Sequence, residues 1–88
     1  MKVYSIEFRS DSQEAKKMFK AVQLFGTIKK AKQRMKEMFD ELTAKYPKAN
    51  HSFVEKDNRA HVWVEQDTFD VPPIFEIANI RIREVKIH

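Results

Sequence analysis

Residues 28–46, IKKAKQRMKEMFDELTAKY, carry the pattern that decides the fold. Apolar residues return every three or four positions and fall within one narrow sector of a helical wheel: Ile28, Ala31, Met35, Met38, Phe39, Leu42 and Tyr46. Thr27 is a favoured helix N-cap, and Pro47 pushes the residue before it out of the helical region. The sequence therefore predicts an amphipathic helix that begins after Thr27 and ends before Pro47.

The stretch directly before this helix fits two structures. Its apolar residues have helical spacing: Ala15, Met18, Phe19, Val22 and Phe25. This spacing predicts a first helix that begins near residues 10–12 and ends at Gly26, so that the two helices form an antiparallel hairpin. Val22 and Leu24 also alternate as residues of a strand do, and a strand over residues 18–25 is the alternative.

Three segments outside the helical region alternate between apolar and polar residues and are predicted to be strands: residues 2–9, 51–56 and 59–66. Asp57 and Asn58 tolerate positive φ and indicate a two-residue turn, which would pair Phe53 with Val62. In that register Ala60, Val62 and Val64 share the face of Phe53, and the opposite face carries Val54, His61 and Trp63.

The last part of the chain is β-rich but irregular. Residues 67–75 contain two prolines and two aspartates, which predicts a loop. In residues 76–88, Ile80 and Ile82 share one phase of the strand, whereas Val85 occupies the other phase. One extra residue would reconcile the two phases, so a β-bulge is predicted near Arg83-Glu84.

The predicted order of elements is strand, helix, helix, strand, strand, strand. This order indicates an α+β fold in which a helical hairpin packs on one face of a mainly antiparallel sheet. The chain has 88 residues, of which 42% are hydrophobic and 34% are charged, so we expect one domain over residues 1–88 with a single core.

Composition also excludes several classes of site. The absence of cysteine excludes a disulfide framework and a thiolate zinc site, and it favours a reducing, cytoplasmic location. The single glycine excludes glycine-rich phosphate loops. The three histidines lack ligand-like spacing, and no nucleophile motif or membrane-length apolar run is present. The sequence thus predicts no metal, no cofactor and no membrane partner.

Positive charge is concentrated in residues 15–36, which contain no Asp or Glu. The cations of this stretch are Lys16, Lys17, Lys20, Lys29, Lys30, Lys32, Arg34 and Lys36. Their eight positive charges exceed the net charge of the whole chain, which is +4, so the other residues together carry a net negative charge. Such asymmetry predicts a surface for an anionic partner, either nucleic acid or an acidic protein surface; a merely solvated lysine-rich face is the alternative.

The order of charges on the second helix supports a binding role. Cations fill its N-terminal half and acids its C-terminal half, which is the reverse of what the helix dipole favours. Each charge placed against the helix dipole lowers the stability of the helix only slightly, but all of these effects act in the same direction. A functional reason for this order would place Lys29, Lys32 and Lys36 as a stripe beside the apolar seam.

A second candidate surface lies on the predicted sheet, where it would comprise His61, Trp63, Arg81 and Arg83. An exposed Trp beside arginines can stack on a base or form an interface hot spot. The alternative is that the loop over residues 67–75, or a helix, covers Trp63.

The element order and the basic charge resemble those of the small RelE/ParE-like toxins, single domains with a strand, a helical hairpin and a following sheet. That resemblance implies RNA cleavage by basic residues on the sheet, and the matching candidates are Arg59, His61, Arg81 and Arg83. Strand-helix-helix order also resembles ribbon-helix-helix repressors, which have no sheet behind the strand.

Because no catalytic motif is present, the sequence predicts a non-enzymatic binding protein of the inhibitor or adaptor type that engages its partner through the lysine-rich helical face. An RNA-cleaving toxin is the alternative. An edge strand, the first or the last, offers a route to a homodimer.

Overall fold

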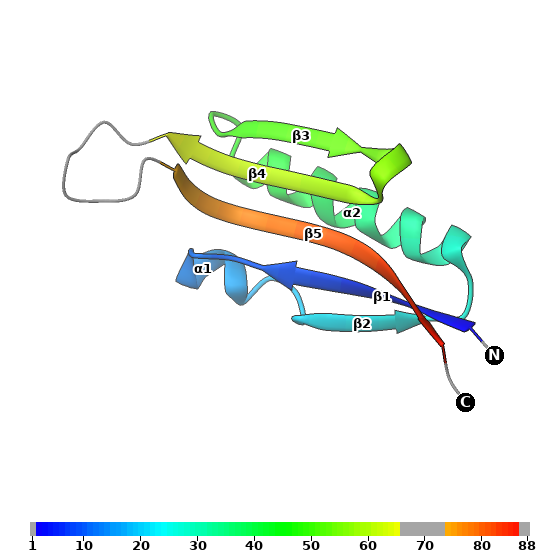
Figure 1. Ribbon diagram of the computed structural model, residues 1–88. Coiled ribbons are helices and arrows are strands. Elements are labelled where there is room, and N and C mark those ends of the chain that lie inside the picture. The colour runs from blue at the N-terminus through cyan, green and yellow to red at the C-terminus, as the bar shows by residue number, and fades with distance from the viewer. Residues whose placement is uncertain (1, 66–73, 87–88) are drawn as a thin grey trace.

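The computed structural model describes residues 2–65 and 74–86 (Figure 1). Its elements are β1 (Lys2–Arg9), α1 (Gln13–Lys16), β2 (Val22–Phe25), α2 (Ile28–Lys45), β3 (Asn50–Val54), the 3₁₀ turn η1 (Glu55–Asp57), β4 (Arg59–Glu65) and β5 (Ile74–Lys86). The five strands form one sheet in the order β2-β1-β5-β4-β3, and every neighbouring pair is antiparallel. Its edges are β2 and β3, so the prediction that the first or the last strand is an edge strand is wrong. The predicted α+β class with a mainly antiparallel sheet is confirmed.

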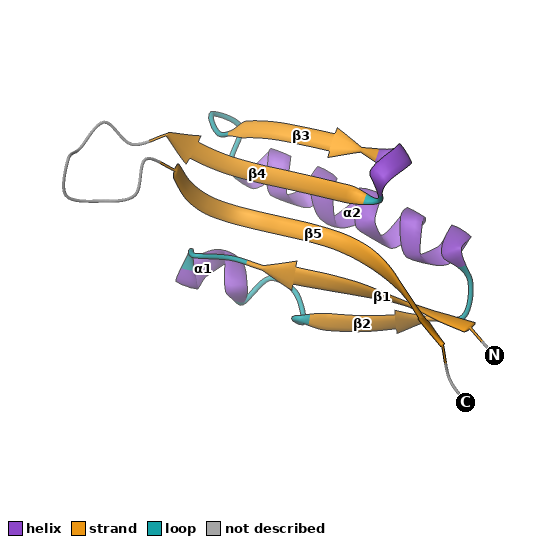
Figure 2. Cartoon of the chain, viewed as in Figure 1, coloured by secondary structure: helices purple, strands orange, loops and turns teal. Residues whose placement is uncertain are grey.

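The helix α2 packs on one face of this sheet, and the strands lie in front of it in Figure 2. Apolar residues of α2 meet every second residue of the central strands in one buried cluster. From the helix come Ala31, Met35, Met38 and Leu42, and from the sheet Ile6, Phe8, Ala60, Val62, Ala78, Ile80 and Ile82. None of the helices described covers the opposite face, which we call the open face of the sheet.

Both ends of α2 follow the sequence signals. The hydroxyl of Thr27 accepts a hydrogen bond from the backbone N–H of Lys30 at 3.2 Å, and the backbone of Thr27 is extended, as an N-cap requires. The helix ends at Lys45, with Tyr46 as its C-cap directly before Pro47. The predicted bounds of this helix are therefore confirmed.

The Thr27 cap gives a first stability prediction. Thr27→Ala removes the oxygen that accepts from Lys30, so the free energy of unfolding should fall by about 0.5–2 kcal/mol. Thr27→Ser keeps that oxygen and is the matched control. Urea unfolding of the two variants measures the difference, and equal stability of the Ala and Ser variants would refute the role of the cap.

The predicted helical hairpin is not present, because the first helix ends after one turn. Ser12 is the N-cap of α1, where its hydroxyl accepts from Ala15 N–H at 3.2 Å, and the helix stops at Lys16. Residues 22–25 form the edge strand β2 instead, which is the strand alternative. Backbone pairing with β1 brings Phe25 opposite Tyr4, and this non-local ladder overrides the helical spacing of the apolar residues.

The turn between β3 and β4 is longer than predicted. It consists of η1 followed by Asn58, whose φ of 54° lies in the left-handed region that asparagine tolerates. Phe53 consequently pairs with Ala60 and not with Val62, so the predicted pairing is wrong. The shift amounts to two residues, which preserves the faces: Phe53 lies on the core side and His61 on the open face, as predicted.

The register irregularity of β5 also lies elsewhere than predicted. Pairing between β1 and β5 is continuous from Lys2–Lys86 to Arg9–Asn79, whereas the shift occurs opposite Val62 and Trp63 of β4. Val85 keeps its phase, pairs with Val3 and is 40% exposed, so no bulge near residues 83–84 is required. Of the loop predicted over residues 67–75, residues 74–75 belong to β5, and the remainder lies outside the described residues.

Candidate anion-binding groove on the open sheet face

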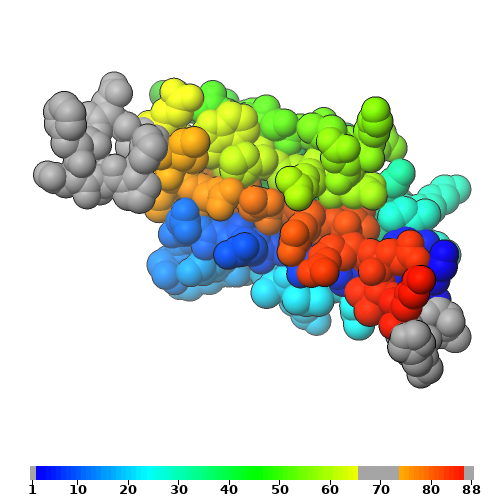
Figure 3. All heavy atoms as spheres, in the orientation of Figure 1, coloured from blue at the N-terminus to red at the C-terminus, as the bar shows by residue number. Residues whose placement is uncertain are grey.

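The open face of the sheet gathers polar residues from four strands. Strand alternation sends every second residue away from α2, and the register aligns these residues in rows across the sheet. One row contains Glu7, Arg81, Arg59 and Val54, and the next contains Arg9, Asn79, His61 and Ser52. Figure 3 shows this face, with β5 lying between β1 and β4 and no helix in front of them.

Two adjoining hollows lie on these rows. The smaller, of about 80 Å³, is lined by Glu7, Arg9, Arg59, Asn79 and Arg81. The larger, of about 170 Å³, is lined by Ser52, Val54, Arg59, Ala60, His61 and Asn79. Arg59 and Asn79 belong to both hollows, which we together call the open-face groove.

The smaller hollow has an excess of positive charge. Among the described residues, Glu7 is the only carboxylate that lines it; Glu7 accepts from Arg81 Nε at 3.0 Å, and its other oxygen lies 3.6 Å from Arg83. Arg9 and Arg59 make no ion pair with any residue in the described ranges 2–65 and 74–86. Three guanidinium groups thus surround one carboxylate, and an anion entering this hollow would meet a favourable potential.

A stacked pair of rings borders the larger hollow. The His61 imidazole lies 4.6 Å from the Trp63 ring at an interplanar angle of 21°. His61 Nε2 is buried and lies 2.9 Å from Glu76 Oε1, but off the line of a well-aligned hydrogen bond. Asn79 donates to the same Glu76 oxygen at 3.0 Å. The imidazole is thereby fixed in place, and Trp63 stays half-buried at the edge of the groove. Whether the segment after residue 65 covers Trp63 lies outside the described residues.

The eight cations of residues 15–36 do not meet on one surface. Lys45 in the last turn of α2 forms an ion pair with Glu14 of α1 at 2.8 Å, and this hydrogen bond raises the pKa of Lys45. Lys16 and Lys17 therefore lie beside the C-terminal end of α2. Lys29 and Lys30 lie in its first turn, about 25 Å away along a helix of 18 residues.

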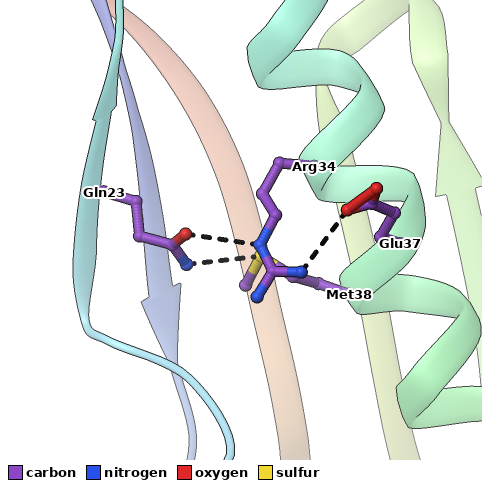
Figure 4. Close-up of polar contacts among 4 residues, drawn as sticks. All are labelled: Gln23, Arg34, Glu37 and Met38. Atoms are coloured by element: carbon purple, nitrogen blue, oxygen red, sulfur yellow. Dashed lines mark hydrogen bonds and ion pairs between the residues drawn. The ribbon is translucent and has the colours of Figure 1, made fainter.

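The cations within α2 are divided between its two flanks. Arg34 faces β2: Figure 4 shows its Nε donating to Gln23 Oε1, at 3.4 Å, and its NH1 near Glu37, at 3.5 Å. Gln23 also contacts the sulfur of Met38 at 3.6 Å. The Arg34 guanidinium lies 5.5 Å from the Phe19 ring, in cation–π contact.

Lys36 lies on the opposite flank, which faces β3. Its Nζ pairs with Asp40 at 2.9 Å and sits 5.3 Å from the ring of Phe53. Lys32 and Lys36 line one shallow hollow of about 290 Å³, together with Gln33, Phe53 and Glu55. Lys29 precedes Lys32 by three positions in α2, so the predicted Lys29/Lys32/Lys36 stripe runs along one side of the helix, apart from Arg34. Lys20 lines a different hollow, beside Arg34.

Sequence reasoning named part of the groove and missed the rest. Arg59, His61 and Arg81 line it, whereas Arg83 lies one row away, paired with Ser5. Glu7, Arg9 and Asn79 were not predicted. The alternation of residues 2–9 places Glu7 and Arg9 on one face, but only the pairing of β1 with β5 brings them to Arg81.

Comparisons with known proteins add no assignment. No protein-family model matches the chain, and neither a curated protein nor a solved structure was found to be similar to it. Within residues 2–65 and 74–86, no cluster of His, Asp and Glu side chains could hold a metal ion. Neither helix described is long and apolar enough to cross a membrane.

Proposed function

We propose that this protein is a non-enzymatic binding protein that holds single-stranded nucleic acid in the open-face groove. The observation that carries the proposal is the convergence of Arg9, Arg59 and Arg81 on one small polar hollow beside the stacked His61–Trp63 pair. The predicted class of function, a binding module for an anionic macromolecule, is kept. We assign the contact to the sheet, because the cations of residues 15–36 are dispersed over α1 and both flanks of α2.

The chemistry of the groove suits a flexible strand. Guanidinium groups present planar sets of donors that match phosphate oxygens. An arginine also loses less side-chain entropy per hydrogen bond formed than a lysine does, because its donors are already held in one plane. Aromatic rings such as the half-buried pair of His61 and Trp63 offer stacking surfaces to unpaired bases, and aliphatic side chains add apolar contacts to them. On the open face these apolar side chains include Val54, Val22 and Leu24, the last 66% exposed. A duplex hides its base faces and would use only the arginines.

Binding is favoured over RNA cleavage by the environment of His61. A general acid or base must reach the proton that it transfers. The Nε2 atom of His61 is buried against Glu76, and its ring is stacked on Trp63. The Nε2 atom is therefore shielded from a ligand in the groove, which counts against proton transfer by this atom of His61 in an RNA-cleaving toxin.

The experiment is a salt titration with a short single-stranded RNA, followed by the fluorescence of Trp63, the only tryptophan of the chain. Binding should change the emission of Trp63. The logarithm of the binding constant should fall linearly with the logarithm of the salt concentration, with a slope of about −2 for three neutralised phosphates. Absence of binding at low salt, or a slope near zero, would refute the proposal.

Three further arms define the ligand class. A duplex of the same sequence should bind more weakly than the single strand, because its bases are not free to stack. Polyglutamate of matched charge should also bind more weakly; equal affinity would instead favour an acidic protein surface. RNA recovered after incubation should keep its full length, and shortened products would favour the toxin alternative.

Because the chain lacks cysteine, the proposal sets this binding in a reducing compartment, the cytoplasm.

A further inference from the structure

We infer that the smaller hollow of the open-face groove is a seat for a terminal phosphate, so that the protein prefers nucleic-acid strands that end in a phosphomonoester. This inference rests on the proposed function and adds the kind of strand that the groove selects. It uses the balance of charge in the hollow, the way its three arginines are held, and the size of the space beside it.

The charge of the hollow fits a monoester better than a diester. Arg9, Arg59 and Arg81 oppose the single carboxylate of Glu7, which leaves two positive charges unmatched. A terminal phosphate carries about −1.5 to −2 charges at pH 7 and has three strong acceptor oxygens. An internal phosphodiester carries one negative charge and two free oxygens, so it would leave part of this positive charge without a partner.

The three arginines approach the hollow from three strands. Arg81 stands on the central strand β5, and its Nε is held by Glu7 at 3.0 Å, which fixes the plane of the guanidinium. Arg9 stands on β1 and Arg59 on β4, on either side of β5. Because these two form no ion pair within the described part of the chain, their charge is available to a ligand. Donors that converge from three directions suit the three oxygens of a terminal phosphate.

The sizes of the two hollows fit a phosphate followed by its nucleoside. The smaller hollow, of about 80 Å³, admits a group of a few atoms and not a base. The larger one, of about 170 Å³, adjoins it through Arg59 and Asn79 and offers the hydroxyl of Ser52 beside the His61 ring. A terminal nucleotide can thus place its phosphate among the arginines and its sugar and base along the neighbouring hollow.

The test compares RNA strands of one sequence that differ only at their ends: a 5′-phosphate, a 3′-phosphate, or hydroxyls at both ends. One of the phosphorylated strands should bind about tenfold more tightly than the hydroxyl strand, as a charge-assisted contact supplies. A hydroxyl-ended strand lengthened by two nucleotides carries two more internal phosphates, which at least matches the charge of about −1.5 to −2 that a terminal phosphate adds. Its affinity should stay near that of the shorter hydroxyl strand.

Variants link the preference to the hollow. Arg59→Gln should reduce the preference to about onefold, whereas Arg83→Gln, on the same face but outside the hollow, should retain it. Both side chains are exposed, so both variants should keep the melting temperature of the parent protein. Equal binding of phosphorylated and hydroxyl-ended strands by the parent protein would overturn this inference and leave the proposed function standing. Failure of every strand to bind would remove the proposed function itself.

Discussion

The double variant Arg9→Glu/Arg59→Glu should lose single-stranded RNA binding by about a hundredfold or more, because two charge-assisted contacts to phosphate become repulsive. Both arginines line the smaller hollow and form no ion pair within the described part of the chain, so their reversal removes contacts to the ligand and not internal ones. Both side chains are exposed, and the fold should be kept.

The matched control is Lys29→Glu/Lys32→Glu on α2. In either double variant two charge reversals lower the net charge by two each, from +4 to zero, so a non-specific effect of charge is the same in both. The control should retain binding within a few-fold, measured by Trp63 fluorescence at one salt concentration. Loss of binding only in the α2 variant would return the site to the lysine-rich helical face. Equal loss in both would show that net charge, and neither surface, governs affinity.

Ile80→Ala should be among the most destabilising single changes in the core. Ile80 is fully buried in the middle of β5, where it pairs with Phe8 on one side and Ala60 on the other. Truncation removes buried methyl groups and leaves a cavity beneath α2, which costs about 2–5 kcal/mol. Total stabilities of small domains are about 5–15 kcal/mol, so the melting temperature should fall by about 10 °C or more.

Val85→Ala is the matched control for this loss. Val85 stands on the same strand but is 40% exposed and lies outside the buried cluster, so its truncation should cost less than about 1 kcal/mol. Urea unfolding followed by Trp63 fluorescence gives both free energies, provided that the two variants show the same dependence on denaturant. Comparable losses in the two variants would mean that the buried cluster does not dominate the stability of this protein.

The elements that could be predicted are those whose signals are local. The helix α2 is bounded by Thr27 and Pro47, both adjacent to it in the chain, and its apolar period extends over five turns. The faces of β4 follow from simple alternation, which placed Val62 in the core and His61 on the open side. Such patterns survive folding because they depend on the residues themselves and not on a distant partner.

The prediction of a long first helix was wrong because the structure of this segment depends on a distant partner. Val22 fits a helical period together with Phe25 and a strand period together with Leu24, and the choice is made by β1, which supplies backbone hydrogen bonds to β2. The pairing of Phe53 depended similarly on whether the turn had two residues or included η1 and Asn58. Neither decision is visible in a short stretch of sequence.

The groove was only half predictable for the same physical reason. His61 and Arg81 belong to segments that alternate visibly and were placed on one surface for that reason, whereas Arg59 was named only through the resemblance to the RelE/ParE-like toxins. Glu7 and Arg81 are 74 positions apart, and their contact exists only because β1 and β5 are neighbours. The cations of residues 15–36 stood out because this stretch lacks Asp and Glu. Their expected position on one shared surface, however, depended on a helical hairpin that does not form.

Along β5, Ala78, Ile80 and Ile82 lie beneath α2, whereas Asn79, Arg81 and Arg83 face solvent. Selection can therefore act on the two series almost separately. Exchanges in the outward series can change which molecule is recognised while the folded scaffold persists, so ligand preference in descendants of this chain is free to diverge faster than their architecture. A single inserted residue has the reverse effect, because it would turn the charged series inward and expose the apolar one.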